Sequence, residues 1–297
     1  NFWYILWEPI KKNKMIYLST GHFQNQDFYK TATEYSKKKI KNIEFSGGKF
    51  TKNIKTKLNK LKKEQKNFIF HNYFPVPNQA FIINLASSNK KILDKIINHF
   101  KNVINLSSSY NIKYISMHAG FKVNFLKNSF KVKKINEVEI IQNKIAETNF
   151  INSIKTLAKL AKKKNITILI ENNVLSKKNY ILFKSNPFLF SESQNIKKLM
   201  KKMPENVGLL LDTGHLKVSC KTLGLNLFDE YKKIYKFIKG YHLSDNNGLA
   251  DTNNMFTKSA WWFKKFNSKL DYYTIEVYDD NISKLKEQVR IVEKKIS

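Results

Sequence analysis

Acidic and imidazole side chains recur at the ends of apolar, strand-like runs in this 297-residue sequence. The runs are IFHNYF, ISMHAG, ILIENN, LLLDTGH, GYHLSDN and YTIEVY, and the residues at their ends are His71, His118, Glu171, Asp212, His242 and Glu276. A carboxylate without a partner is very costly to bury, so each of the acidic residues needs one. A cation could partner several of them at once. The sequence therefore predicts a metal site.

Longer lysine-rich segments separate these runs, with apolar residues recurring every three to four positions, and this alternation indicates repeated βα units. The expected strands are Ile16–Ser19, Asn42–Phe45, Phe68–Asn72, Tyr114–His118, Thr167–Glu171, Gly208–Asp212, Gly240–Leu243 and Tyr273–Val277. The expected helices include Asp27–Lys38, Lys90–Asn105, Glu137–Lys164, Gln194–Lys202, Leu227–Lys236 and Asn281–Lys295. Eight such units in about 280 residues predict an α/β protein with a single (β/α)8 TIM barrel. A doubly wound open sheet is the alternative.

In a closed barrel the carboxyl ends of all strands meet at one mouth, so residues far apart in sequence become neighbours there. Glu171, Asp212, His242 and Glu276 stand at the ends of four consecutive expected strands, which makes them the expected metal ligands. Three carboxylates and one imidazole form an oxygen-rich site that suits a divalent metal, with Mn²⁺ favoured and Mg²⁺, Co²⁺ or Zn²⁺ left open.

Other polar residues near strand ends have a purely structural interpretation as well. His71 and His118 could equally be core histidines with satisfied hydrogen bonds. Glu44 and His22 are weaker candidates for a site, and His99, inside a helical segment, is expected to be structural.

The formal net charge of +31 and the pI of about 9.9 would favour a nucleic-acid partner. Arg290 is, however, the only arginine, and the lysines are spread along the whole chain with abundant Asn and Ile, as an AT-rich coding sequence would produce. A nucleic-acid partner is therefore not expected.

No apolar run reaches the length of about 18 residues that a membrane span needs. Cys220 is the only cysteine, and no signal peptide is visible, so we expect a cytoplasmic protein.

The chain reads as one domain because no linker or low-complexity break divides it. We interpret residues 15–297 as this domain and residues 1–14 as an N-terminal extension. Met15 is a candidate for the true start, and whether the extension is native is left open. A homo-oligomer is possible, but no exposed apolar stripe identifies an interface.

Four short motifs give the chain a resemblance to a known family. They are Glu171-Asn172, the Asp-Thr-Gly-His stretch Asp212–His215, the His-Leu-Ser-Asp stretch His242–Asp245, and Glu276 near the last strand. With these motifs the chain resembles, from Met15 to its C-terminus, the xylose isomerase-like TIM barrel superfamily. This superfamily contains sugar and sugar-phosphate isomerases and epimerases together with endonuclease IV.

The isomerase and epimerase branch implies that Glu171, Asp212, His242 and Glu276 hold one divalent ion and that the two glutamates form the acid/base pair. Moving a proton next to a carbonyl requires a base, a second acid/base group and an electrophile that stabilises the developing enediolate. We expect a small carbohydrate substrate, contacted by His71, His118, His215 and Asp251, with His215 pointing into the mouth from a loop. Whether the substrate is phosphorylated is left open.

Two alternatives remain. The endonuclease IV branch implies a metal-dependent phosphodiesterase acting on abasic DNA, but its Asp-x-His pair is replaced here by Asp251-Thr252-Asn253. The other alternative is a non-catalytic barrel that serves as an accessory protein in carbohydrate metabolism.

The excursion His71–Ser87 after the third strand is expected to overhang the mouth as a lid or specificity loop.

Overall fold

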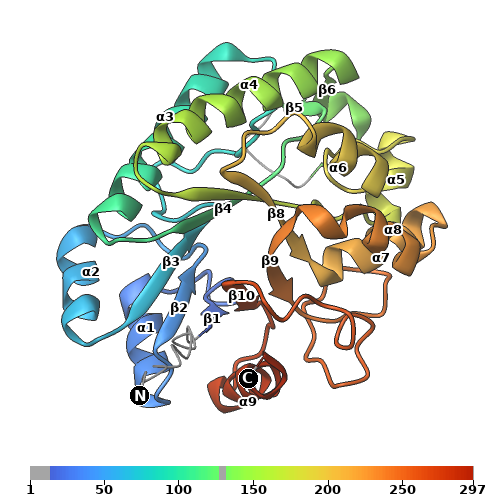
Figure 1. Cartoon of the computed structure of the whole chain (residues 1–297). Helices are drawn as coiled ribbons and strands as arrows, with labels where there is room; N and C mark the ends of the chain where they lie inside the picture. Colours follow the sequence, from blue (N-terminus) through green and yellow to red (C-terminus); the bar gives the residue numbers. More distant parts are fainter. Residues whose placement is uncertain (1–13, 127–131, 297) are drawn as a thin grey trace, which may run out of the picture.

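The strands of this protein close into a ring surrounded by helices in the computed structural model, which describes residues 14–126 and 132–296 (Figure 1). The barrel strands are β1 Met15–Ser19, β2 Asn42–Phe45, β3 Asn67–His71, β4 Tyr114–His118, β7 Thr167–Glu171, β8 Val207–Asp212, β9 Ile238–Leu243 and β10 Tyr272–Ile275. All neighbouring strands are parallel, and β10 pairs with β1. The predicted (β/α)8 TIM barrel is confirmed, and the open-sheet alternative is wrong.

The strand bounds follow the sequence closely because short β-branched and aromatic runs mark the strands. β9 begins at Ile238, before the expected Gly240, and β10 ends at Ile275, before the expected Val277. Glu276 therefore lies directly after its strand and not within it, although its backbone N–H still donates to the carbonyl oxygen of Leu243 at 3.1 Å.

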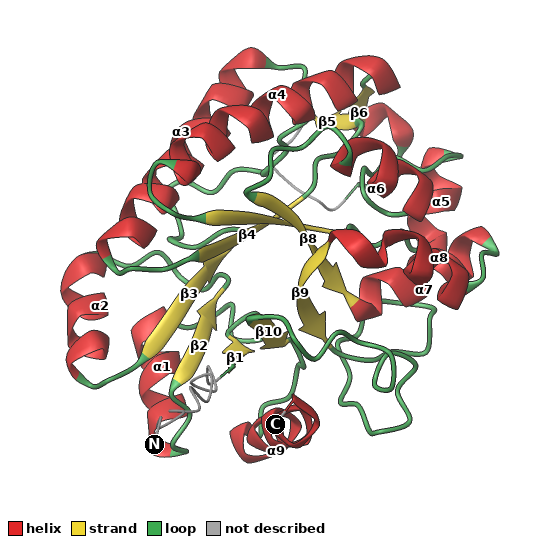
Figure 2. Ribbon diagram, in the orientation of Figure 1, coloured by secondary structure: helices red, strands yellow, loops and turns green. Residues whose placement is uncertain are grey.

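The helices enclose the barrel on its outer side (Figure 2). They are α1 Phe28–Lys37, α2 Ile54–Lys63, α3 Lys90–Ser109, α4 Asn143–Lys162, α5 Lys177–Phe183, α6 Ser193–Met200, α7 Thr213–Leu223, α8 Leu227–Ile234 and α9 Ile282–Ile296. In α4 the residues Phe150, Ile154, Leu157 and Ala161 are buried, which is the apolar face that the sequence predicted. No helix in the described ranges is long and apolar enough to cross a membrane.

The helix expected over Glu137–Lys164 is wrong in its first part. Ile135–Glu137 form a 3₁₀ turn, and Val138–Ile140 form strand β6, which pairs antiparallel with β5, Val123–Phe125. The β-branched residues in Val138–Ile140 favour this hairpin, so α4 begins only at Asn143.

Three helices were not anticipated: α2, α5 and α7. The buried Leu58 and Leu61 of α2 are three positions apart, a helical spacing that the sequence did display. α7 begins immediately after the last residue of β8, so His215 lies in the first turn of a helix and not in a loop. The expected N-terminal extension lies outside the described residues except for Lys14, whose Nζ donates to the carbonyl oxygen of Ile296 at 2.8 Å.

Candidate metal centre

The mouth of the barrel gathers the ionisable side chains expected there. Glu171 and Asp212 end β7 and β8, His242 lies on β9, and Glu276 follows β10. All four are buried, and one possible ligand atom of each lies within 4.8 Å of the others. The closure of the barrel thus brings together the set of four that the sequence had suggested as metal ligands.

Glu171 occupies the centre of this group, with imidazoles on both of its carboxylate oxygens. Its Oε1 lies 3.1 Å from His242 Nδ1, and its Oε2 lies 3.3 Å from His118 Nδ1 and 3.4 Å from His71 Nε2. Burial acts to raise the pKa of Glu171, but the facing imidazoles of His118, His242 and His71 hold it well below the ordinary value. The carboxylate is therefore ionised.

A second group overlaps the first. His71, His118 and Glu171 also place one possible ligand atom each within 4.8 Å of one another, so Glu171 belongs to both groups. The two histidines were expected to contact substrate, and they lie as close to Glu171 as ligands of a second ion would. Burial lowers the pKa of His118 to about 4, which leaves its imidazole neutral near pH 7.

Asp212 joins the metal group to helix α7. Its Oδ1 accepts a hydrogen bond of 2.6 Å from the backbone N–H of His215 and so caps the helix. Asn172 holds the Asp212 backbone by accepting from its N–H at 2.7 Å and donating to its carbonyl oxygen at 3.1 Å. Burial raises the pKa of Asp212 to about 8, against the opposing effect of His215.

Several buried oxygens of the site lack a hydrogen-bond partner. They include Glu171 Oε2 and Asp212 Oδ2. Buried polar atoms are nearly always hydrogen-bonded, and leaving one without a partner costs about 1–3 kcal/mol. A divalent cation would satisfy these oxygens, and the carboxylate-rich donor set suits a hard cation. The residues present therefore fit a metal ion.

His215 and Asp251, both expected to contact substrate, are bonded to each other. His215 Nδ1 donates to the carbonyl oxygen of Asn172 at 2.7 Å, and Nε2 donates to Asp251 Oδ2 at 3.1 Å. Since both partners are acceptors, both ring nitrogens carry hydrogen. Burial acts to lower the pKa of His215, but the Asp212 and Asp251 carboxylates raise it well above the ordinary value.

Glu44 is the residue that the sequence interpretation undervalued. It is fully buried on β2, and its Oε2 lies 3.1 Å from His242 Nε2. Burial acts to raise the pKa of Glu44, but His242 and His71 lower it overall. A glutamate inside the apolar run NIEF was the available signal. His22, the other weaker candidate, has Nε2 2.9 Å from Oδ1 of the exposed Asp280.

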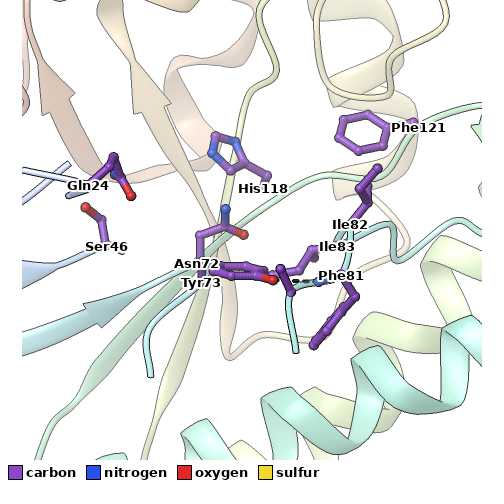
Figure 3. Close-up of a pocket in the computed structure, with 10 residues that line it drawn as sticks. Gln24, Ser46, Asn72, Tyr73, Phe81, Ile82, Ile83, His118 and Phe121 are labelled. Carbon is purple, nitrogen blue, oxygen red and sulfur yellow. Dashed lines mark hydrogen bonds between the residues drawn. The ribbon is translucent and has the colours of Figure 1, made fainter. Parts of the chain in front are cut away.

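A cavity of about 400 Å³ opens beside His118, bordered by the expected lid segment after β3 (Figure 3). Its lining residues are Gln24, Ser46, Asn72, Tyr73, Ala80, Phe81, Ile82, Ile83, His118 and Phe121. These described residues are amides, a serine, a histidine and apolar or aromatic groups, with no lysine, arginine or carboxylate among them. Such a lining suits a neutral polar molecule better than an anion.

The metal-free protein is expected to lose stability as the pH rises from 6.5 to 8. The folded pKa of Asp212, about 8, exceeds its ordinary value of 3.8, so its stabilising contribution is complete below pH 3.8 and is lost by about pH 8. The raised pKa values of His215 and His242 act in the same direction above 6.5. The lowered pKa values of Glu44 and Glu171 add stability above 4.5 and are constant across this window.

Melting temperatures recorded by circular dichroism in the presence of a chelator measure this loss. Asp212→Asn retains a residue that caps helices well and removes the titrating group, so its melting temperature should fall less steeply with pH. A wild-type melting temperature that rises from pH 6.5 to 8, or equal slopes in the two proteins, would contradict the expectation.

Comparison with known proteins shows a family model and several solved structures to which this chain is similar. A family model described as a xylose isomerase-like TIM barrel matches residues 49–290. A D-tagatose 3-epimerase-like protein has a similar structure, with a TM-score of 0.68 and 16% identity over 95% of this chain and 99% of that chain. The 3-keto-D-glucoside 4-epimerase of E. coli has a TM-score of 0.66 and 8% identity over 94% of this chain and 98% of that chain.

A third similar structure is an AP endonuclease, family 2, from Brucella melitensis, with a TM-score of 0.64 and 13% identity over 93% of this chain and 98% of that chain. At this level of sequence identity, the comparison shows a similar fold and nothing more. No significant sequence match to a curated protein was found.

Proposed function

Since the chain belongs to the xylose isomerase-like TIM barrel family, we propose that it is a divalent-metal-dependent isomerase or epimerase of a small carbohydrate. One observation carries the proposal: two glutamates flank a single imidazole in the centre. Glu171 Oε1 and Glu276 Oε2 lie 3.1 Å and 2.7 Å from His242 Nδ1. Asp212 completes the group within 4.8 Å.

In this proposal Glu171, Asp212, His242 and Glu276 hold the ion, for which Mn²⁺ is favoured. A bound divalent cation would polarise the carbonyl oxygen of the substrate. Glu171 and Glu276 reach the centre from β7 and from the end of β10, so the two carboxylates can remove and return a proton on a carbon next to that carbonyl. His71, His118, His215 and Asp251 are the proposed substrate contacts.

The cavity beside His118 supports an unphosphorylated substrate. The chain has 54 lysine and arginine residues, yet none of them is among the described lining residues of this cavity. A phosphate group is normally recognised by arginine, lysine or a set of backbone N–H groups. Asn72 and Gln24 offer amide donors and acceptors that suit hydroxyl groups. We therefore favour a neutral sugar over a sugar phosphate.

Phosphodiester hydrolysis is the second candidate, and one specific observation favours it. The overlapping group of His71, His118 and Glu171 would hold a second ion beside the first, and clustered ions suit displacement at phosphorus. Two features count against it: the neutral cavity lining, and Asn253 at the position where endonuclease IV-like sequences place a histidine.

Metal content and proton exchange test the proposal on one sample. We expect mass spectrometry to find about one Mn²⁺-like ion per chain, and solvent deuterium to enter ketoses next to the carbonyl, with ketose phosphates exchanging more slowly. Two or more zinc ions per chain without exchange, together with cleavage of abasic DNA, would favour the phosphodiesterase. A protein that binds no metal would support the accessory-protein alternative.

A further inference from the structure

A buried hydrogen-bond network lies beneath the candidate metal centre, and all of it converges on Glu44. We propose that Glu44 is a positioning residue that fixes the protonation pattern of two imidazoles, His242 directly and His71 through Tyr272 and Ser116. Each imidazole then turns its other ring nitrogen toward Glu171. The inference rests on the proposed metal centre and adds to it a residue that contacts no substrate.

Three side chains contact one carboxylate oxygen of Glu44. Its Oε2 lies 3.1 Å from His242 Nε2, accepts from Thr274 Oγ1 at 3.0 Å, and also accepts from the hydroxyl of Tyr272. Tyr272 and Thr274 are two residues apart on β10, so both side chains emerge on the same face of that strand. The carboxylate of Glu44 is thereby held in one orientation inside the barrel.

The direct branch determines which nitrogen of His242 faces the metal centre. An ionised carboxylate accepts hydrogen bonds and has no hydrogen to donate, so Nε2 of His242 must carry the hydrogen in its contact with Glu44. Nδ1 is then the nitrogen turned toward Glu171 Oε1 and Glu276 Oε2. A carboxylate behind a ligating histidine is the usual arrangement that fixes the ring and raises its basicity as a ligand.

The indirect branch reaches His71 through two hydroxyl groups. Tyr272 uses its single hydroxyl hydrogen on Glu44, so in the 3.0 Å contact with Ser116 its oxygen must accept. Ser116 then uses its own hydrogen on Tyr272, and its Oγ accepts from His71 Nδ1 at 2.9 Å. Nε2 of His71 is consequently the nitrogen that faces Glu171 Oε2, at 3.4 Å.

The two branches act on the two imidazoles that face the two carboxylate oxygens of Glu171. One carboxylate thus sets the imidazole that faces Glu171 Oε1 and the imidazole that faces Glu171 Oε2. Glu44, His71 and His242 also lie within 4.8 Å of one another and could themselves hold a cation. We assign Glu44 to support because its Oε2 is already engaged by His242, Tyr272 and Thr274. Its Oε1 has no hydrogen-bond partner, so ligation through that oxygen is the alternative that the number of bound ions decides.

Nuclear magnetic resonance of metal-free protein labelled with ¹⁵N-histidine tests the protonation pattern, and six histidines give a simple spectrum. Long-range ¹H–¹⁵N correlations should show hydrogen on Nδ1 of His71 and on both ring nitrogens of His242, because without a metal ion both of its nitrogens face carboxylates. Tyr272→Phe should change the pattern of His71 and leave that of His242 intact, whereas Glu44→Gln should change both. Spectra of both variants identical to wild type would overturn the proposal.

Matched controls come from buried groups outside the mouth. Tyr231→Phe removes a buried hydroxyl that lies 3.0 Å from the Tyr241 hydroxyl and donates to the carbonyl oxygen of Lys265 at 2.8 Å. Glu230→Gln neutralises a buried carboxylate that pairs with Lys233 at 2.7 Å. Neither should alter the signals of His71 or His242. If Glu44→Gln does not fold, the contrast between Tyr272→Phe and Tyr231→Phe decides the question.

Equilibrium dialysis with Mn²⁺ and with Zn²⁺ supplies the second readout. Glu44→Gln should weaken binding by about 10- to 100-fold without changing the number of ions bound, the usual effect of losing a group behind a ligand. Loss of one ion per chain would show that Glu44 is itself a ligand and would overturn the proposal. A wild-type protein that binds no ion would refute the metal centre, while the spectra would still decide the protonation pattern.

Discussion

Glu171→Gln is expected to remove metal binding and to reduce proton exchange by about 10²- to 10⁴-fold. Glu171 belongs to both candidate ligand groups, and each of its oxygens faces at least one imidazole. Its replacement therefore leaves neither group complete, and it also removes one of the two proposed acid/base residues. Metal stoichiometry by mass spectrometry and deuterium incorporation into a ketose measure the two losses.

The same substitution is expected to lower the free energy of unfolding. A glutamine leaves buried histidines without their carboxylate, and breaking a buried charged pair typically costs about 3–5 kcal/mol. Denaturant unfolding of the metal-free proteins measures the change, with Glu230→Gln as a control for a buried glutamate away from the mouth. Full metal occupancy with normal exchange in Glu171→Gln would exclude Glu171 from the centre.

Glu276→Gln is expected to disrupt one of the two ligand groups and to leave the other complete. Glu276 belongs to the group with Asp212 and His242 but not to the group formed by His71, His118 and Glu171. Its loss should weaken metal binding without abolishing it and should reduce proton exchange by at least ~10²-fold, since one of two acid/base groups is gone. Dialysis and deuterium incorporation on one preparation provide both values.

The exposed Glu287 of α9 offers a matched control, because Glu287→Gln changes the net charge equally and lies outside the mouth. Its exchange rate should equal that of the wild type. If Glu276→Gln also exchanged deuterium at a nearly normal rate, Glu276 would be removed from the mechanism and the acid/base pair would have to be sought elsewhere.

The proximity of the four proposed ligands could be predicted from the sequence because a barrel makes their positions equivalent. Each residue lies at or next to the carboxyl end of a short apolar strand, and parallel closure brings all strand ends to one mouth whatever the loops between them do. Glu171 and His242 are 71 residues apart in sequence, yet their side chains lie 3.1 Å apart. Once the fold class was known, the local sequence pattern was therefore enough to predict that these four side chains lie close together.

The role of Glu44 could not be predicted in the same way. The charge inside NIEF shows that a buried partner is needed, but the partner, His242, is 198 residues away in sequence. The contact depends on how side chains fill the barrel interior, which strand periodicity does not specify. Helix α7 was missed for a different reason: it begins without any loop after β8, and its first turn is as buried as the strand.

Asp212 has one oxygen bonded to the start of α7 and the other without a partner at the site. A change in the surroundings of this carboxylate therefore also affects the first turn of that helix. An ion that fixed the free oxygen would also immobilise the capping oxygen and slow the hydrogen exchange of the His215 amide. Hydrogen exchange at the first turn of α7 would therefore show whether a cation is bound at the mouth of the barrel.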